Sequence, residues 1–269
     1  MPTEEQTHEV PNVSSRGQAG HRGGVQIAAR GESDVVVIDD IAFEPNVQKL
    51  MKRLRVKEGT RFADQLTALV EEAKAIARPR AMYTVAHVDS RDEGGVVIGG
   101  IEFRSRVLRV NLDAVHRVFP FVITCGGELH EWMKAKDDLL VRYHADVVSE
   151  AAVQSAAETL KAHLVRRYGL GRTSTMSPGS LEDWPIQEQR PLFDLLGDPE
   201  AAIGVQLTGS MLMIPSKSVS GIRFPVEKTF ESCQLCQRER CPGRRAPYDE
   251  ELCERRYQLE PAQASAPMR

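Results

Sequence analysis

The amino-acid sequence is poor in the features that mark several large classes of protein. Only 6% of its 269 residues are aromatic, which argues against a carbohydrate site or a surface on which single-stranded bases stack. The 35 lysines and arginines are outnumbered by 38 acidic residues, so the net charge of −3 offers no basic surface for nucleic acid. No apolar run approaches the roughly 20 residues that span a bilayer. We therefore expect neither nucleic acid nor membrane as a partner.

The sequence also lacks a segment that would direct the chain out of the cell. Residues 1–33 are polar and glycine-rich, without the charged and then apolar build of a secretory signal. A chain without such a signal is expected in a reducing compartment, where disulfides are rare. We therefore expect a cytoplasmic protein in which disulfides are the least favoured use of the five cysteines.

Four segments are expected along the chain. Residues 1–33 predict a disordered leader and residues 258–269 a disordered tail, because both are polar and have little apolar periodicity. Residues 34–228 have enough periodic apolar positions for one large domain. Residues 229–257 contain four of the five cysteines and predict a small metal-binding extension.

Strand-like and helical periodicities alternate through the main domain. Hairpins occur beside longer crossovers, which favours an α+β fold, a mostly antiparallel sheet with flanking helices. Apolar spacing predicts helices at 45–55, 62–76, 127–133, 138–168 and 186–196. Short apolar runs predict strands at 35–38, 83–88, 96–103, 107–112, 121–125, 203–208, 211–214 and 218–224.

Four cysteines near the C-terminus form the most specific chemical pattern. Cys233, Cys236, Cys241 and Cys253 follow the spacing C-x2-C-x4-C-x11-C. Two residues between cysteines turn the chain back, so both thiolates can bind one metal centre. A third thiolate after a short arm and a fourth after a longer one complete a four-sulfur ligand set.

Two metal centres take four thiolates, and the spacing favours one of them. Zinc ribbons usually pair two Cys-x-x-Cys knuckles, and the second knuckle is missing here. A 4Fe–4S cluster also takes four cysteines, and the observed spacing suits it better. The pattern resembles the cluster motif of corrinoid iron–sulfur proteins, with a shorter last gap. We therefore expect a 4Fe–4S cluster, with zinc as the alternative.

Three blocks upstream of the cysteines resemble a known family. The first spans 177–196 and begins Ser-Pro-Gly, the second spans 203–211, and the third, 215–221, reads Pro-Ser-Lys-Ser-Val-Ser-Gly. In this order they resemble the reactivation domain of cobalamin-dependent methionine synthase, in a stand-alone form. The resemblance covers roughly residues 36–225, and the Ser-Val-Ser-Gly block is its most specific part.

The resemblance implies a fold and a function together. The family has a twisted antiparallel sheet with flanking helices, and its domain binds S-adenosylmethionine (SAM) in a shallow groove. It docks onto a cobalamin domain, where cobalt(II) is reduced by one electron and remethylated from SAM. For this chain the resemblance implies an accessory subunit of a cobalamin-dependent methyltransferase, with the cobalamin on a corrinoid-binding partner chain. The four-cysteine site is then the expected source of the electron.

The resemblance also implies SAM contacts, and the sequence departs from the family among them. Ser177 and Gly179 fall in the family's Pro-Gly loop, where glycine permits close backbone approach. The arginine that binds the SAM carboxylate in the family is Thr175 here, and the family's tyrosine is Ser180. Threonine cannot replace a bidentate arginine, so Arg172 is the expected substitute.

Two further groups are candidate ligand contacts. Glu158, on the long predicted helix, falls near a family acidic residue that could meet the SAM amino group. Lys217, with Ser218 and Ser220, forms a hydroxyl-rich cluster that faces either the corrin or SAM. In the alternative interpretation the cluster is a structured turn whose hydroxyls bond to nearby backbone groups.

A second functional hypothesis is a binding module without catalysis. The departures at Thr175 and Ser180 favour a domain that only binds a corrinoid protein or a methyltransferase. In that case a structural zinc or an inert cluster fixes the C-terminal extension. SAM binding separates the two hypotheses, because only the reactivation hypothesis requires it.

Overall fold

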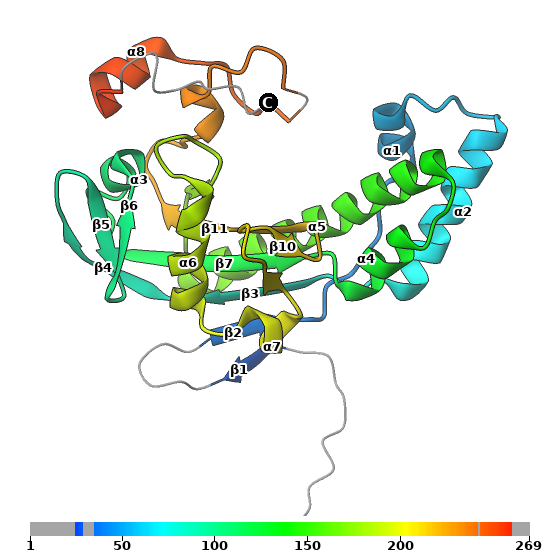
Figure 1. Cartoon of the computed structure of the whole chain (residues 1–269), viewed down its shortest axis with the longest axis horizontal. Helices are drawn as coiled ribbons and strands as arrows, with labels where there is room; N and C mark the ends of the chain where they lie inside the picture. Colours follow the sequence, from blue (N-terminus) through cyan, green and yellow to red (C-terminus); the bar gives the residue numbers. More distant parts are fainter. Residues whose placement is uncertain (1–24, 29–34, 242, 260–269) are drawn as a thin grey trace, which may run out of the picture.

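A computed structural model of the chain describes residues 25–28, 35–241 and 243–259 (Figure 1). Among these residues, nine strands form one antiparallel sheet, which confirms the predicted α+β fold. The order along the sheet is β1-β2-β3-β7-β4-β5-β6, with β11 beside β7 and β8 beside β11. These strands are β1 Val25–Ala28, β2 Val35–Ile38, β3 Arg80–Thr84, β4 Ala86–Arg91, β5 Gly95–Ile98, β6 Ile101–Arg104, β7 Arg117–Thr124, β8 Thr173–Met176 and β11 Ser218–Pro225.

Strand β7 is the centre of the sheet because it has partners along both edges. β3 pairs with its C-terminal half, where Tyr83 lies opposite Phe121, and β4 pairs with its beginning, where Ala86 lies opposite Val118. β11 pairs along the other edge, and β8 pairs with β11. Every residue of β7 after Arg117 is buried, as a continuous apolar run in a covered strand predicts.

The side chains of β7 alternate between two hydrophobic cores, one on each face of the sheet. Phe121 and Ile123 pack with the helices α1, α2, α4 and α5, whereas Val118 and Val122 pack with α3, α6, α7 and the C-terminal segment. The helices are α1 Val47–Leu54, α2 Arg61–Ile76, α3 Arg106–Asn111, α4 Gly127–Lys134, α5 Leu139–Tyr168, α6 Gln189–Leu196, α7 Pro199–Ile203 and α8 Glu250–Leu252. Short elements are η1 Ile186–Glu188, η2 Ser232–Leu235 and η3 Cys253–Tyr257, and a separate hairpin of β9 Gln206–Leu207 and β10 Met213–Ile214.

Helix α5 runs along one face of the sheet and confirms the longest predicted helix (Figure 1). Asp138 caps its start, and the carboxylate accepts hydrogen bonds from the backbone N–H groups of Leu140 and Val141 at 2.8 and 2.9 Å. Gly169 ends it with a positive φ of 63°. Ala152 and Ala156 are fully buried, so the helix approaches its neighbours closely.

Residues 107–111 form most of helix α3 and Leu112 ends it, so the strand predicted at 107–112 is wrong. Ser105 caps the helix through a 2.9 Å hydrogen bond from the Leu108 N–H. The Asp183 carboxylate accepts hydrogen bonds from the N–H groups of Arg106 at 3.2 Å and Val107 at 2.9 Å. The donors at the start of α3 are therefore satisfied by a residue that lies far away in the sequence.

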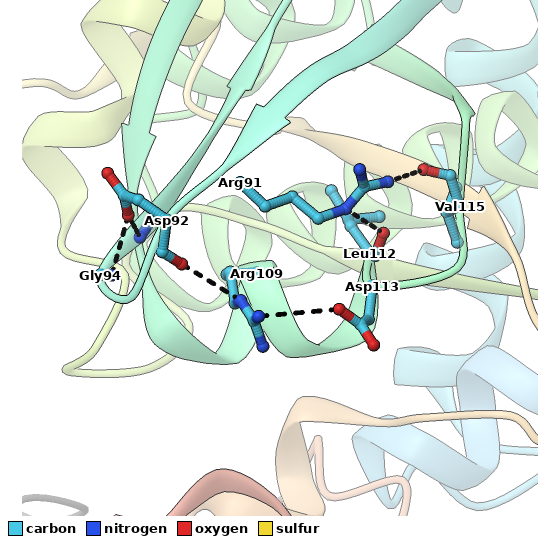
Figure 2. Close-up of polar contacts among 8 residues, drawn as sticks. Arg91, Asp92, Gly94, Arg109, Leu112, Asp113 and Val115 are labelled. Atoms are coloured by element: carbon cyan, nitrogen blue, oxygen red, sulfur yellow. Dashed lines mark hydrogen bonds and ion pairs between the residues drawn. The ribbon is translucent and has the colours of Figure 1, made fainter.

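Arginine side chains hold α3 against the neighbouring hairpin (Figure 2). Arg109 donates from Nε to the carbonyl of Asp92 at 3.2 Å, which joins the helix to the turn after β4. Arg91 donates to the carbonyls of Leu112 and Val115 at 3.0 and 2.5 Å, which joins β4 to the end of the helix. These contacts fix the helix to the hairpin from both directions.

Other predicted elements differ in extent from those observed. The strand predicted at 83–88 is divided between β3 and β4. The strand predicted at 203–208 is reduced to β9, because α7 extends to Ile203. Asp198 caps α7 through a 2.9 Å hydrogen bond from the Ala201 N–H, and Pro199 suits its first turn. Strand β8 was not predicted.

The ends of the chain are described only in part. Strand β1 lies within the segment predicted as a disordered leader, and it pairs with β2, which follows that segment. The remainder of that leader, and residues 260–269 of the predicted tail, lie outside the described residues. No helix in the described part of the chain is both long and apolar enough to cross a membrane.

The C-terminal segment, residues 229–259, packs onto the core instead of projecting from it. Phe230, Leu235 and Tyr257 are buried, and the ring centroids of Phe230 and Tyr257 lie 5.6 Å apart. The Tyr257 hydroxyl donates to Asn111 Oδ1 of α3 at 2.7 Å, and the Phe230 N–H donates to Ser174 Oγ of β8 at 2.7 Å. The cysteines therefore sit on a segment that hydrophobic packing already holds in place.

Candidate functional site

A cavity of about 230 Å³ lies between helix α5, the sheet and the C-terminal segment. Its apolar lining includes Phe121 of β7 and Val153 of α5. Its polar lining includes Thr175 of β8 with Ser177 and Ser180 of the following loop. The structure thus brings Ser177, a predicted SAM contact, into one cavity with Thr175 and Ser180, the two positions at which the sequence departs from the family.

The loop after β8 is held in a tight turn. The Gly179 N–H donates to the Trp184 carbonyl at 2.7 Å, and both the N–H and the hydroxyl of Ser180 donate to the Ser177 carbonyl, at 3.1 and 2.6 Å. Gly179 has a φ of +79°, and a Cβ there would lie 2.9 Å from the Ile186 side chain. The positive φ therefore favours glycine at this position, and the buried Trp184 anchors the turn beside the cavity.

Two arginines that the sequence did not predict as ligand contacts also line the cavity. Arg223 of β11 lies directly opposite Thr175 in the sheet, and it donates from Nη1 to Thr173 Oγ1 at 3.0 Å. Arg245 of the C-terminal segment pairs through Nε with Glu231 at 3.0 Å. The only sequence signal for Arg223 is a charged residue within a strand whose neighbours are buried.

The two arginines differ in how far their side chains are buried. Arg223 is partly buried, and this burial lowers the pKa of its guanidinium, with Glu231 opposing and Arg245 reinforcing the effect. The Arg223 Nε is buried and has no acceptor among the described residues. The Arg245 side chain is 63% exposed, so water screens its ion pair with Glu231.

The structure places the other predicted SAM contacts around the cavity or outside it. Glu158 is exposed on α5 and accepts a 3.0 Å hydrogen bond from Gln154, which lines the cavity. Arg172 is exposed, does not line the cavity and donates to the Glu227 carbonyl at 3.4 Å. Glu158 is therefore within one helical turn of the cavity, whereas Arg172 points to a different contact.

The hydroxyl-rich cluster is bonded largely within the protein. Ser220 is buried and donates to Gln189 Oε1 at 2.5 Å, on the face of the sheet opposite α5. Ser218 donates to the Pro215 carbonyl at 2.7 Å. Lys217 Nζ pairs with Asp146 of α5 at 2.8 Å. Of these contacts, that of Ser218 is with a nearby backbone group, as the structured-turn interpretation expects, whereas Ser220 and Lys217 bond to side chains of α6 and α5.

The four cysteines lie in one segment, but their side chains do not surround a common centre. Within the residues that the structure describes, no group of three or more His, Cys, Asp or Glu side chains is arranged to hold a metal ion. The backbone between the first two cysteines forms a turn, in which the Cys236 N–H donates to the Cys233 carbonyl at 3.3 Å. Cys253 is buried at the start of η3. The ligand types suit zinc or a cluster, whereas the side-chain arrangement does not form either site.

A guanidinium group organises the loop that carries the cysteines. Arg244 donates to the carbonyls of Cys233 and Cys236 at 3.1 Å each and to that of Ala246 at 3.2 Å, and it also contacts the Arg238 carbonyl. One side chain thus gathers carbonyls from across the loop.

The thiols of Cys233 and Cys253 differ in acidity. Burial acts to raise the pKa of Cys233, but backbone N–H groups of Arg245 and Ala246 and the Arg245 charge outweigh it and lower the pKa. Burial raises the pKa of Cys253, against an opposing hydrogen bond from Tyr248. Cys233 is therefore the more readily ionised of the two.

Comparison with known proteins yields distant similarity to solved structures. No family model and no curated protein matches the sequence. Among solved structures, the chain is similar to a crystal structure of the MetH reactivation domain bound to AdoHcy, with 15% identity and a TM-score of 0.48. The alignment covers 79% of this chain and 82% of that chain.

Proposed function

We propose that this chain reactivates a corrinoid methyltransferase partner of the methionine synthase type by binding SAM in the cavity beside α5. One observation carries the proposal. Residues from two sequence blocks that resemble the reactivation family, Ser177 and Ser180 in the first and Val219 in the third, line the same cavity as helix α5. Separate motifs that converge on one cavity are expected of a ligand site.

The size of the cavity limits how much of SAM it can enclose. Its volume of about 230 Å³ is below the range of roughly 300–1,000 Å³ typical of pockets for whole small molecules. The cavity therefore suits one end of the ligand, and the remainder lies over the adjoining surface. This matches the shallow groove that the resemblance implies.

The methyl transfer that this role requires needs no metal or cofactor bound to this chain. The partner's corrin cobalt, once reduced by an external one-electron donor, would supply the nucleophile that takes the methyl group from the SAM sulfur, and S-adenosylhomocysteine would be the product that leaves. The role of this chain is to hold SAM with its methyl group towards the partner and to exclude water from the reacting atoms.

Calorimetric titration with SAM tests the proposal, and micromolar binding is expected. Ala157→Phe fills the cavity from α5 and should weaken binding at least about tenfold. Lys161→Phe places the same side chain at an exposed position of the same helix and should bind SAM as the wild type does. Absence of SAM binding in the wild type contradicts the proposal and favours the non-catalytic binding module.

Transfer of the methyl group tests the second half of the proposal. We expect isotopically labelled methyl to move from SAM to a cobalamin-binding fragment of methionine synthase, loaded with cobalt(II) and supplied with titanium(III) citrate, only when this chain is present. SAM binding without transfer to this fragment would contradict the methionine synthase type of partner.

The cysteine segment carries a separate proposal, a 4Fe–4S cluster with zinc as the alternative. No electron-transfer step is assigned to it, because the described side chains are not arranged around one centre. If a cluster is present, the anaerobically purified protein should contain about four irons per chain. It should also absorb at about 400 nm, and dithionite should bleach this absorbance. Structural zinc predicts a colourless protein with about one zinc.

Paired cysteine variants decide whether the motif holds the metal. Cys233→Ser with Cys236→Ser should remove the bound metal completely, because half of the thiolate set is lost. Cys125→Ser is the matched control, since Cys125 is a buried thiol at the end of β7, outside the motif. A wild type without metal, or a double variant that keeps it, would contradict the metal site.

A further inference from the structure

The cavity contains an uncompensated positive charge that the folding of the domain does not use. Arg223 and Arg245 both line it, and Glu231, which pairs with Arg245, supplies one negative charge against their two. No described carboxylate forms an ion pair with Arg223. A partly buried cation without an ion pair is costly, so an anionic partner would stabilise the folded state.

Arg223 is positioned to face a ligand in the cavity. The register of β8 and β11 sets Arg223 opposite Thr175, on the same face of the sheet and beside the same loop. Its Nη1 is anchored to Thr173, whereas its buried Nε has no acceptor among the described residues. A guanidinium anchored at one nitrogen is held in place and still has donors for a carboxylate.

We propose that Arg223 binds the carboxylate of the SAM methionine moiety, with Arg245 of the C-terminal segment contributing a second positive charge. The proposal rests on the proposed function and identifies the anion subsite within it. The subsite is formed jointly by the sheet and the C-terminal segment. The cation at this subsite is supplied from strand β11, across the sheet from Thr175, and not from Arg172.

The subsite also gives a role to Glu158, which lies beside the cavity. The ammonium group of the same ligand moiety carries a positive charge and needs an acceptor. Glu158 lies within one helical turn of the lining residue Gln154 and bonds to it. With the carboxylate at Arg223, the ammonium group of the ligand is directed towards Glu158.

Arg223→Gln, compared with two ligands, tests the proposal. The variant should bind SAM about 10–100-fold more weakly than the wild type, as loss of a charge-assisted pair predicts. Its affinity for decarboxylated SAM should stay within about twofold of the wild-type value, because that ligand has no carboxylate. Arg190→Gln, an exposed arginine on α6, is the matched control and should change neither affinity.

Further variants keep the test informative if Arg223→Gln folds poorly. Arg245→Gln changes an exposed side chain and should weaken SAM binding by a smaller factor, about twofold to fivefold, again without an effect on decarboxylated SAM. Equal losses for both ligands would indicate a structural role and overturn the proposal. A loss with Arg172→Gln and none with Arg223→Gln would overturn it as well.

A separate experiment tests the anion subsite if the wild type does not bind SAM. Acetate then serves as the probe, and the Nε–H resonance of Arg223, assigned by its absence in Arg223→Gln, is followed by nuclear magnetic resonance. A saturable shift supports the anion subsite while the proposed function fails. No shift with acetate and no SAM binding overturn both.

Discussion

Replacing Tyr257 with alanine is expected to lower the free energy of unfolding by about 4 kcal/mol and to release the C-terminal segment. The ring is fully buried against Phe230, and its hydroxyl donates to Asn111 of α3 at 2.7 Å. The substitution removes both the apolar burial and the partner of a buried amide. Urea unfolding would give the change in stability, and trypsin would report release through faster cleavage at Arg238, Arg240, Arg244 and Arg245.

Tyr257→Phe separates the two contributions. It keeps the ring and removes only the hydrogen bond, so a loss of about 1–3 kcal/mol is expected, with the segment still resistant to trypsin. If Tyr257→Ala left both stability and cleavage unchanged, packing would not hold the segment. Metal binding by the cysteines would then be its principal constraint.

Asp183→Ala is expected to lower the free energy of unfolding by about 3 kcal/mol. The carboxylate accepts hydrogen bonds from the Ser105 hydroxyl at 2.5 Å and from the N–H groups of Arg106 and Val107. Its loss leaves the N–H groups of Arg106 and Val107 without their acceptor, so that Ser105 alone caps α3, and it frees the loop that begins at Ser177. The unfolding midpoint in urea measures the first effect, and SAM affinity measures the second.

A neighbouring carboxylate supplies the control for this prediction. Glu182→Ala removes an exposed acidic residue and should change stability by less than about 0.5 kcal/mol. Equal effects of Glu182→Ala and Asp183→Ala would mean that the negative charge of the loop matters and that capping of α3 does not.

Elements with a strong local signal could be predicted from the sequence. Helix α5 has a cap residue, a long periodic pattern and a terminal glycine, all within its own segment. Helix α2 likewise begins after Thr60, which caps it, and ends before Pro79. Strand β7 was indicated by its apolar run. In each case the interactions that define the element involve residues next to it in the sequence.

Elements that depend on distant residues could not be predicted. The apolar spacing of 107–112 fits a strand as well as a helix, and the choice is made by the Asp183 carboxylate, which comes from a different loop. Strand β8 is short and polar, and it exists because β11 pairs with it. Secondary structure at such positions follows from tertiary pairing and not from local propensity.

The candidate site also contains residues that could be predicted from the sequence and residues that could not. Ser177 and Gly179 were indicated by the family resemblance, because the Ser-Pro-Gly loop that carries it is a local feature. Arg223 was not, since a single arginine in a strand gives no sign of which residue lies opposite it. The sequence also predicted four metal-ligand cysteines, whereas the described side chains of the C-terminal segment are organised by Arg244 and by burial of Tyr257.

The sequence by itself determined the α+β class, the long helix, the turn at Gly179 and the presence of four thiols in one short segment. These follow from periodicity, turn chemistry and spacing, which act over a few residues. Only the tertiary structure decided that β8, β11, α5 and the C-terminal segment enclose one cavity, and that Arg223 stands opposite Thr175 within it. Strand register and packing create these contacts between residues that are far apart in the chain, and no local pattern encodes them.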